Sequence, residues 1–435
     1  MTEPDVLVIG GGPAGVAAAT ELAALGQRVV LVEQRDRLGG AIHRAYVGPG
    51  VNPLPVVARH RRHWATLATR LVQAGDRIRT HYETVFLGVD GGGRFLLDDR
   101  AGGRVVSVRP KAVVLAVGAM EVVMPRPGWE LPGVTTAGGL QVQMKETGCA
   151  PQGPVLVAGT GPLPFALAAQ LAAAGNPPVA VLERGQPARA AWQYPQLARD
   201  GLRSVANIKD AIGYGVRLLR AGVPYLQGWA VMAVAEVPEG LLVTCQHVDG
   251  RTQQHRVRHL ALHDGLVPQS HGLPTQETAG VPVVRAGDCR EVLGADGAFS
   301  DGQRAAHTVA RELGIPVADR GLEGLLAAAR RTQHAMATLC AAPVSSPAVD
   351  TVICRCEGLR RVDLDALQGA HSAREIRLVG RFGMGVCQGR FCAAHVARLA
   401  AESSVNFDPA DLAGGVPRWP LRPVSVSALA AFNGD

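Results

Sequence analysis

A glycine-rich turn between two apolar runs constrains this chain more than any other feature. An apolar run from Val6 leads into Gly10, Gly12 and Gly15, then a helical pattern, then a second apolar run that ends in Glu33. Strand, glycine turn, helix and acid in this order are typical of a βαβ unit that binds a dinucleotide. Gly10 allows a tight turn, Gly12 lets a pyrophosphate approach the backbone, and Gly15 lets the helix pack on the strand.

The ligand contacts of this unit are expected at the start of the helix and after the second strand. Unpaired N–H groups and the positive end of the helix dipole favour the pyrophosphate there, and Glu33 is expected to accept a hydrogen bond from a ribose hydroxyl. The residues assigned to this site are Gly10, Gly12, Pro13, Ala14, Gly15, Glu33, Gln34 and Arg35. The alternative is a glycine-rich turn in an α/β domain that binds no nucleotide.

A second unit with the same plan begins near residue 154. Gly159 and Gly161 form its turn, and its second apolar run ends in Glu183. The third glycine position holds Pro164, which a first helical turn tolerates but which does not give the close packing of glycine. The sequence leaves open whether Gly159, Gly161 and Glu183 bind a nucleotide or form an empty site. If a nucleotide binds, Glu183 favours NAD or ATP over NADP.

Length and charge narrow the class of protein. The chain has 435 residues, enough for about three domains. Its 44 basic and 37 acidic residues give a net charge of +7, and the basic residues are scattered, so no nucleic-acid footprint is expected. No secretion signal precedes the first strand, which predicts a cytoplasmic protein. The uncharged span 153–182 is interrupted by glycines and prolines, so we expect strand, turn, helix and strand rather than a transmembrane helix.

Four of the eight cysteines are grouped near the C-terminal end. Cys354 and Cys356 form a C-x-C pair, and Cys387 and Cys392 form a C-x4-C pair. Four thiolates joined by a helical spacer would supply the ligands of a 2Fe-2S cluster. Zinc is the rival because it also takes thiolates, although structural zinc sites usually use C-x2-C pairs, and uncoordinated thiols are the third alternative. His395 is expected outside the ligand set, since four cysteines suffice.

Three further motifs, together with the first glycine turn, resemble flavoproteins with two dinucleotide-binding domains, the glutathione-reductase-like architecture. They are Leu38-Gly39-Gly40, Ala116-Val117-Gly118-Ala119 and Arg285-Ala286-Gly287-Asp288. The resemblance implies FAD at the first turn, with Gly39, Gly40, Gly118, Ala119, Gly287 and Asp288 around it. Asp288 would lie beside the flavin ribityl and phosphate. Cys289 follows it where small residues are commoner in that family.

Residues 351–404 resemble the helical 2Fe-2S domain of bacterioferritin-associated ferredoxin. A 2Fe-2S domain that follows an FAD domain in one chain is similar to the A (alpha-type) subunits of opine oxidase, hydrogen cyanide synthase and dye-linked proline and hydroxyproline dehydrogenases. This resemblance covers nearly the whole chain. The stretches 126–134 and 418–423 are similar to recurring stretches in those subunits. Ala41 is a departure, because relatives often carry glutamine there beside the flavin.

These features predict an α/β fold with two Rossmann-like dinucleotide-binding domains and a small helical C-terminal 2Fe-2S domain. The expected parts are a discontinuous FAD-binding domain at 1–150 and 280–325, a second nucleotide-binding domain at 151–279, a linker helix at 326–350, the 2Fe-2S domain at 351–404 and a proline-rich tail at 405–435. Alternating residues at 83–109 predict antiparallel hairpins.

Two absences bear on catalysis. No acid/base constellation indicates a substrate pocket, so no catalytic residue is assigned, and the nucleotide domains lack a C-x2-C pair for a dithiol relay. His255, His259 and His263 share a four-residue spacing, but their surroundings indicate a strand near the surface rather than a metal site.

The resemblance implies an electron-transfer subunit of a heteromeric amino-acid or opine dehydrogenase. A catalytic FAD-containing partner subunit, with or without a further small subunit, would oxidise a C–N bond in proline, hydroxyproline, an opine or glycine, and electrons would pass through FAD and the 2Fe-2S cluster to an acceptor. The alternatives are a stand-alone NADH-dependent flavin and iron-sulfur reductase and a structural subunit whose FAD only holds the fold. The complex would be cytoplasmic, with peripheral attachment to the inner membrane left open.

Overall fold

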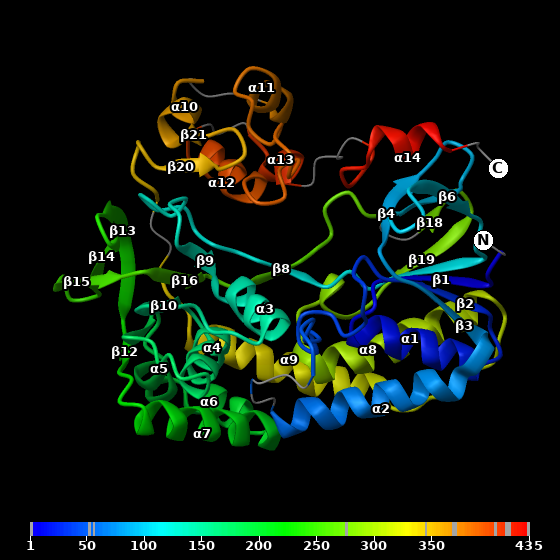
Figure 1. Cartoon of the computed structure of the whole chain (residues 1–435), viewed down its shortest axis with the longest axis horizontal. Coiled ribbons are helices and arrows are strands. Elements are labelled where there is room, and N and C mark those ends of the chain that lie inside the picture. The colour runs from blue at the N-terminus through cyan, green and yellow to red at the C-terminus, as the bar shows by residue number, and fades with distance from the viewer. Residues whose placement is uncertain are drawn as a thin grey trace.

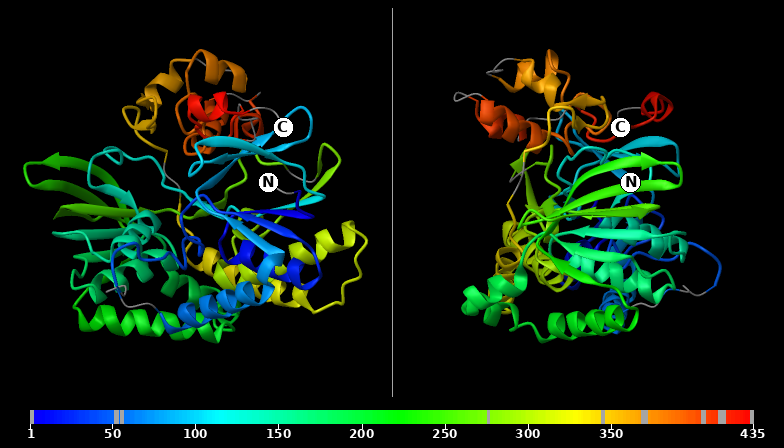
Figure 2. Two further views of the ribbon diagram at one scale, coloured as in Figure 1. Left: turned by 45° about the vertical axis from the view of Figure 1, so that its right-hand side comes forward. Right: turned by 90° about the vertical axis from the view of Figure 1, so that its left-hand side faces the viewer.

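The structure is a computed structural model that describes residues 3–50, 54, 57–274, 277–343, 346–367, 372–403, 407–413 and 419–432. Two α/β bodies lie side by side, and a smaller, mostly helical body lies above them (Figure 1). Both views of Figure 2 place that C-terminal body on the opposite side of the molecule from the long helices α2 and α7.

The first body is built on a six-stranded sheet in the order β18-β19-β7-β1-β2-β3. Its strands are β1 (Val6–Ile9), β2 (Val29–Val32), β3 (Ile78–His81), β7 (Ala112–Leu115), β18 (Glu277–Thr278) and β19 (Val281–Arg285). Only β18 runs antiparallel to its neighbour. The helices that accompany it are α1 (Pro13–Ala24), α2 (Ala58–Ala74) and α8 (Gly294–Glu312). Small residues bring α1 and α8 together, since a Cβ on Gly302 would lie 2.2 Å from the Ala14 carbonyl oxygen.

The predicted hairpins cover the other face of this sheet. Strands β4 (Thr84–Val89), β5 (Phe95–Asp99) and β6 (Arg104–Val108) form a three-stranded antiparallel sheet. Phe86 and Phe95 pack with buried residues of β1 and β7, including Leu7 and Leu115. The expectation of antiparallel hairpins at 83–109 is therefore confirmed.

The second body repeats the parallel design with strand order β12-β11-β10-β16-β9. Its strands are β9 (Val134–Thr136), β10 (Val155–Gly159), β11 (Ala180–Glu183), β12 (Tyr225–Gln227) and β16 (His259–His263). Its helices are α3 (Ala137–Thr147), α4 (Pro162–Ala173), α5 (Pro187–Gln193), α6 (Pro195–Gly201) and α7 (Val205–Arg220), and an antiparallel sheet follows with β13 (Trp229–Val237), β14 (Gly240–His247) and β15 (Thr252–Val257). The uncharged span 153–182 thus forms β10, α4 and most of β11, as predicted.

Two details differ from the sequence-based expectation. Strand β9 pairs with β16, so residues 134–136 belong to the second sheet although the sequence places 1–150 in the first domain. His263 ends a buried parallel strand between β10 and β9 rather than a strand near the surface. Both differences have the same cause: β9 supplies a fifth strand that covers β16 and makes it internal.

Two connections and the C-terminal body complete the fold. Strands β8 (Ala119–Glu121) and β17 (Leu266–Pro268) pair as a ribbon between the two larger bodies. Helix α9 (Leu322–Leu339) leads to the C-terminal body, which contains β20 (Val352–Cys354), β21 (Leu359–Arg360), α10 (Arg361–Asp365), α11 (Ala373–Leu378), α12 (Ala393–Ser403) and α13 (Pro409–Ala413). The last helix, α14 (Val426–Ala430), returns to the β4–β6 sheet, where Ala428 packs with Leu87 and Val105 (Figure 1).

Candidate functional site

The first glycine turn has two kinds of glycine. A Cβ on Gly10 would lie 2.4 Å from the Ala116 carbonyl oxygen, and one on Gly15 would lie 1.8 Å from the Gly10 carbonyl oxygen, so both positions need glycine for backbone packing. A Cβ on Gly12 would meet no protein atom closer than the Gly40 Cα, at 3.7 Å. Gly12 therefore leaves open space beside the turn, which is where a bound pyrophosphate would lie.

The motifs picked out by resemblance gather around this turn. The Gly39 amide donates to the Gly11 carbonyl at 2.8 Å, and a Cβ on Gly40 would lie 3.1 Å from the Gly12 Cα. A Cβ on Gly287 would lie 2.5 Å from the Ala14 Cβ. Gly118 follows β7, the neighbour of β1, and has a positive φ of 77°.

The N-terminus of α1 fits an anionic ligand. No side chain caps the helix, and its first turn carries no acidic residue, so Ala14 and Gly15 present backbone N–H groups without competition from an acidic side chain. Such a helix start, flanked by glycines, is a suitable site for a pyrophosphate.

Glu33 closes the turn from the end of β2. Its two carboxylate oxygens accept hydrogen bonds from the Gly11 amide at 2.8 Å and the Arg35 amide at 2.9 Å. Each carboxylate oxygen has a further acceptor site, which leaves capacity for a ribose hydroxyl. Gln34 is exposed, and the Arg35 side chain pairs with Glu146 of α3 at 3.1 Å.

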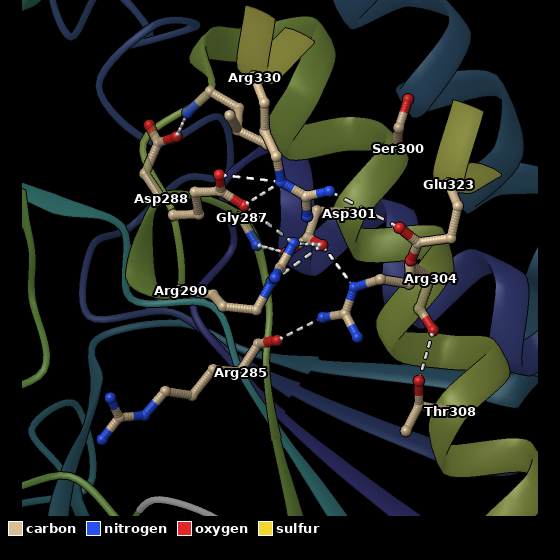
Figure 3. Close-up of polar contacts among 12 residues, drawn as sticks. Arg285, Gly287, Asp288, Arg290, Ser300, Asp301, Arg304, Thr308, Glu323 and Arg330 are labelled. Carbon is tan, nitrogen blue, oxygen red and sulfur yellow. Dashed lines mark hydrogen bonds and ion pairs between the residues drawn. The ribbon is translucent and has the colours of Figure 1, made fainter. Parts of the chain in front are cut away.

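The Gly287 turn is stabilised by an ion-pair network whose residues are not marked by any sequence motif. The Gly287 amide donates to Asp301 at 2.7 Å, and the Arg290 and Arg304 guanidinium groups point toward the same carboxylate at 2.6 and 2.5 Å (Figure 3). Burial opposes ionisation of Asp301, but the hydrogen bonds from both arginines outweigh it and lower the pKa of this carboxyl. Asp301 thus fixes the backbone just before Asp288.

Asp288 itself has a different environment. Its carboxylate accepts a hydrogen bond from the Leu293 amide at 3.1 Å, and burial raises its pKa above the ordinary range. It forms no ion pair with the arginines around Asp301 among the described residues (Figure 3). The neighbouring Cys289 is buried, which raises the pKa of its thiol to about 11.

The segment after Gly40 is contacted by a partly buried lysine of α3 that the sequence analysis did not identify. Lys145 of α3 donates to the Ala41 and Ile42 carbonyls at 3.1 and 3.2 Å, and burial lowers its pKa to about 8. His43 faces His63 with 2.9 Å between ring nitrogens, and burial lowers the pKa of His43 to about 3. Nothing in the local sequence ties Lys145 to Ala41, because the contact joins two distant parts of the chain.

The second glycine turn repeats the geometry of the first. Glu183 accepts from the Gly161 amide and from the Gly185 amide, both at 2.9 Å, and burial raises its pKa despite these bonds. The start of α4 differs because Pro164, which stands where α1 has Gly15, is a second residue without an N–H group after Pro162, whereas the start of α1 has only Pro13. Fewer free donors therefore face an anion here than at α1.

The end of α9 covers this second turn. The Thr160 hydroxyl donates to the Cys340 carbonyl at 2.7 Å, and a Cβ on Gly185 would lie 2.5 Å from the same oxygen. Burial raises the pKa of the Cys340 thiol to about 12. The chain's own backbone thus lies beside the turn and the residues after Glu183, where the adenosine of a bound nucleotide would be expected.

The grouped cysteines lie together in the C-terminal body. The thiols of Cys354, Cys387 and Cys392 interact with one another; the interaction with Cys392 lowers the pKa of Cys354 and of Cys387, and Cys387 also interacts with Cys356. The donor chemistry fits an iron-sulfur cluster, in which four cysteine sulfurs hold two irons. Within the residues that the structure describes, no three His, Cys, Asp or Glu side chains are arranged to hold a metal ion as they stand, so the ligand set stays a prediction.

The C-terminal body is seated on the second body, near residues 123–129. The Trp129 indole nitrogen donates to the Val352 carbonyl at 2.7 Å, and the Arg355 guanidinium lies 5.1 Å from the centre of the Trp129 ring. His395 is buried against the Val123 backbone, where it also interacts with Asp264. His395 therefore contributes to docking.

One loop connects the cysteines with the first glycine site. The Gln269 amide donates to the Gly118 carbonyl at 3.0 Å, and the Gln269 carbonyl accepts from the Cys289 thiol at 3.5 Å. Two residues on, the His271 ring interacts with the backbone of Gln388, next to Cys387. Burial lowers the pKa of His271. The loop thus contacts both regions at once.

None of the helices in the described ranges combines the length and apolar character needed to cross a membrane. The described parts of the tail attach to the first body: Leu421 donates its amide to the Leu87 carbonyl at 2.8 Å and is buried in that core. Arg418, part of the stretch singled out by resemblance, lies outside the described residues.

Comparison with known proteins gives consistent results. The profile of the pyridine nucleotide-disulphide oxidoreductase family matches residues 4–198. The chain is 32% identical to hydrogen cyanide synthase subunit HcnB of Pseudomonas protegens, covering 97% of each protein, and 31% identical to the A subunit of opine oxidase from Rhizobium meliloti, covering 98% of each. Its fold is similar to that of L-proline dehydrogenase from P. horikoshii, with a TM-score of 0.65, 19% identity, and coverage of 98% of this chain and 79% of that one.

Proposed function

The chain belongs to the family of hydrogen cyanide synthase subunit HcnB and the opine oxidase A subunits, and from that premise we propose that it is the electron-transfer subunit of a heteromeric amino-acid or opine dehydrogenase. A partner subunit with its own FAD would remove two electrons from a C–N bond of proline, hydroxyproline, an opine or glycine. Those electrons would leave through this chain to an acceptor. Its relatives are subunits of flavin oxidoreductases, and the family implies FAD in this chain.

The FAD would be held by the first glycine site. The α1 N-terminus would take the pyrophosphate, Glu33 the ribose, and the turns at Gly39, Gly118 and Gly287 would keep side chains away from the cofactor. Asp288 would lie beside its ribityl and phosphate. Bound FAD supplies exchange between two-electron and one-electron chemistry, and a 2Fe-2S cluster on Cys354, Cys356, Cys387 and Cys392 supplies one-electron transfer.

The observation that carries this proposal is the 269–271 loop. Its Gln269 amide is hydrogen-bonded to Gly118 at the first site, and its His271 ring interacts with the Gln388 backbone in the cysteine loop, so the two proposed redox sites share one short connection. This arrangement suits a chain that moves electrons and leaves substrate chemistry to a partner.

The rival function is a stand-alone NADH-dependent reductase. It requires NADH at the second turn, where the Cys340 carbonyl is bonded to Thr160 and lies against Gly185. Pro164 also removes a backbone donor from the start of α4 that α1 keeps at Gly15. These features favour the electron-transfer subunit over the reductase.

The test is co-expression of this chain with a catalytic FAD-containing partner subunit. We expect a stable complex in which proline, hydroxyproline, an opine or glycine reduces the iron-sulfur centre of this chain. Visible and EPR spectra monitor this reduction. The isolated chain, loaded with FAD and cluster, should not oxidise these substrates. Turnover by the isolated chain at a rate comparable with the complex would contradict the proposal.

A further inference from the structure

Arg390 lies inside the cysteine loop, between Cys387 and Cys392. Its side chain is half-buried and donates a hydrogen bond to the Leu421 carbonyl, while its Nε is buried without a partner. The guanidinium interacts electrostatically with Cys387. A cation thus lies within electrostatic range of one of the predicted cluster ligands.

A second cation, Arg422, is brought to the same place by the tail. Leu421 is fixed by its backbone bond to Leu87 and by its burial in the first body's core, so the position of the next residue is fixed as well. The half-buried Arg422 donates to the Leu421 carbonyl at 3.3 Å and interacts electrostatically with Arg390. Two guanidinium groups therefore converge on one carbonyl oxygen.

No acid compensates this pair in the part of the chain that the structure describes. Other arginines of the C-terminal body do have acidic partners: Arg381 pairs with Glu357 at 2.6 Å and Arg361 with Asp365 at 2.9 Å. Neither Arg390 nor Arg422 forms an ion pair with a described carboxylate. Two like charges in a partly buried site repel each other, so their position favours a strongly negative centre nearby.

We propose that Arg390 and Arg422 form a cationic pair that raises the reduction potential of the centre bound by the four cysteines. The inference rests on the proposed function, which puts a 2Fe-2S cluster on Cys354, Cys356, Cys387 and Cys392. One-electron reduction adds one negative charge to such a cluster and breaks no bond to its ligands. Fixed positive charge in a low dielectric stabilises the reduced form more than the oxidised form, so it promotes electron uptake by this chain.

The test is an EPR-monitored redox titration of the full chain, carrying FAD and cluster, with dithionite as the reductant. Arg390→Met and Arg422→Met should each lower the midpoint potential of the cluster. Arg390→Lys keeps the charge but loses the guanidinium geometry, so it should retain most of the wild-type potential. Arg374→Gln removes an exposed charge of the same body, which solvent screens, and should leave the potential unchanged.

The possible results separate the two hypotheses. A wild-type chain without iron or an EPR signal would contradict the cluster, and with it the proposed function. A wild-type cluster whose potential is unchanged in both Met variants would overturn the inference alone. An equal fall in Arg390→Lys and Arg390→Met would also overturn it, because geometry rather than charge would then set the potential. If Arg390→Met does not retain the cluster, Arg422→Met decides.

Discussion

The Trp129 indole nitrogen donates a hydrogen bond to the Val352 carbonyl over 2.7 Å, which ties the second body to the strand that carries Cys354. Arg355 lies over the same indole ring at 5.1 Å. The second attachment is in the tail, where a Cβ on Gly88 would lie 2.7 Å from Trp419 and Leu421 is buried in the first body. Both stretches that resemble recurring sequences of the family thus attach the C-terminal body to the two larger ones.

Replacing Trp129 with Phe should loosen the C-terminal body. The change keeps most of the ring but leaves the Val352 carbonyl without its donor, which costs about 1–3 kcal/mol for a buried group. Hydrogen exchange at residues 352–354 should become faster. Trp192→Phe is the control, because Trp192 is 86% exposed and its indole should contribute little. Unchanged exchange in Trp129→Phe would show that this hydrogen bond does not hold the body in place.

Gly12→Val and Gly15→Val should separate ligand binding from folding. A Cβ on Gly12 has room among the protein atoms, so the variant should fold with a loss of stability within about 1 kcal/mol, yet its side chain would occupy the pyrophosphate position and abolish FAD binding. At Gly15 the Cβ would lie 1.8 Å from a carbonyl oxygen, and the variant should lose about 3 kcal/mol or more. Thermal unfolding measures the stability of each variant, and flavin absorbance measures its FAD content. Full flavin content in a folded Gly12→Val protein would refute the assignment.

Cys354→Ser, Cys356→Ser, Cys387→Ser and Cys392→Ser should each reduce the iron content of anaerobically purified protein. Serine replaces a soft thiolate by a poor iron ligand. Cys149→Ser is the control because Cys149 is exposed and far from this group in the sequence. Zinc without iron in the wild type would favour the rival metal, and full iron in Cys387→Ser would remove that residue from the ligand set.

The local parts of this structure follow from the sequence because neighbours in the chain determine them. The first βαβ unit, the hairpins at 83–109 and the grouping of cysteines all arise from short-range patterns of glycine, apolar residues and spacing. The resemblance added the motifs at Gly39, Gly118 and Gly287, which the fold brings to one turn.

The remaining features depend on contacts between distant segments. Asp301 stabilises the Gly287 turn with arginines that no motif marks, and Trp129 meets Val352 across 223 positions in the chain. Strand β9 joins a sheet formed mainly by later residues. The position of α9 over the second turn likewise follows from no local sequence pattern. The sequence alone therefore does not decide whether a nucleotide binds at that turn.

Lys145 should make the free energy of unfolding depend on alkaline pH. Its pKa is about 8 in the folded chain, against about 10.5 when unfolded, so between these values the unfolded state binds more protons and stability rises with pH. Well below pH 8 Lys145 is charged in the folded chain, and its burial lowers the free energy of unfolding by an amount on the order of 3 kcal/mol. Urea unfolding from pH 7 to 10.5 should show this rise relative to Lys145→Met. Parallel pH profiles for the two proteins would contradict it.

The second glycine turn should bind neither ATP nor NAD in the wild-type chain. Its pyrophosphate position has one backbone donor fewer than the first turn because Pro164 stands where α1 has Gly15, and the Cys340 carbonyl lies where the adenosine would contact Thr160 and Gly185. A nucleotide would have to displace the end of α9, which adds the cost of the lost contacts to the cost of binding.

Thermal unfolding with each nucleotide at saturating concentration tests this expectation, with FAD added to flavin-free protein as the positive control. A ligand at 100 times its Kd stabilises the folded state by about 2.7 kcal/mol, so binding at the first turn should be plain in the same assay. We expect no shift with ATP or NAD. A shift that Glu183→Ala abolishes and Glu33→Ala retains would place a nucleotide at the second turn, and would require the end of α9 to move aside for it.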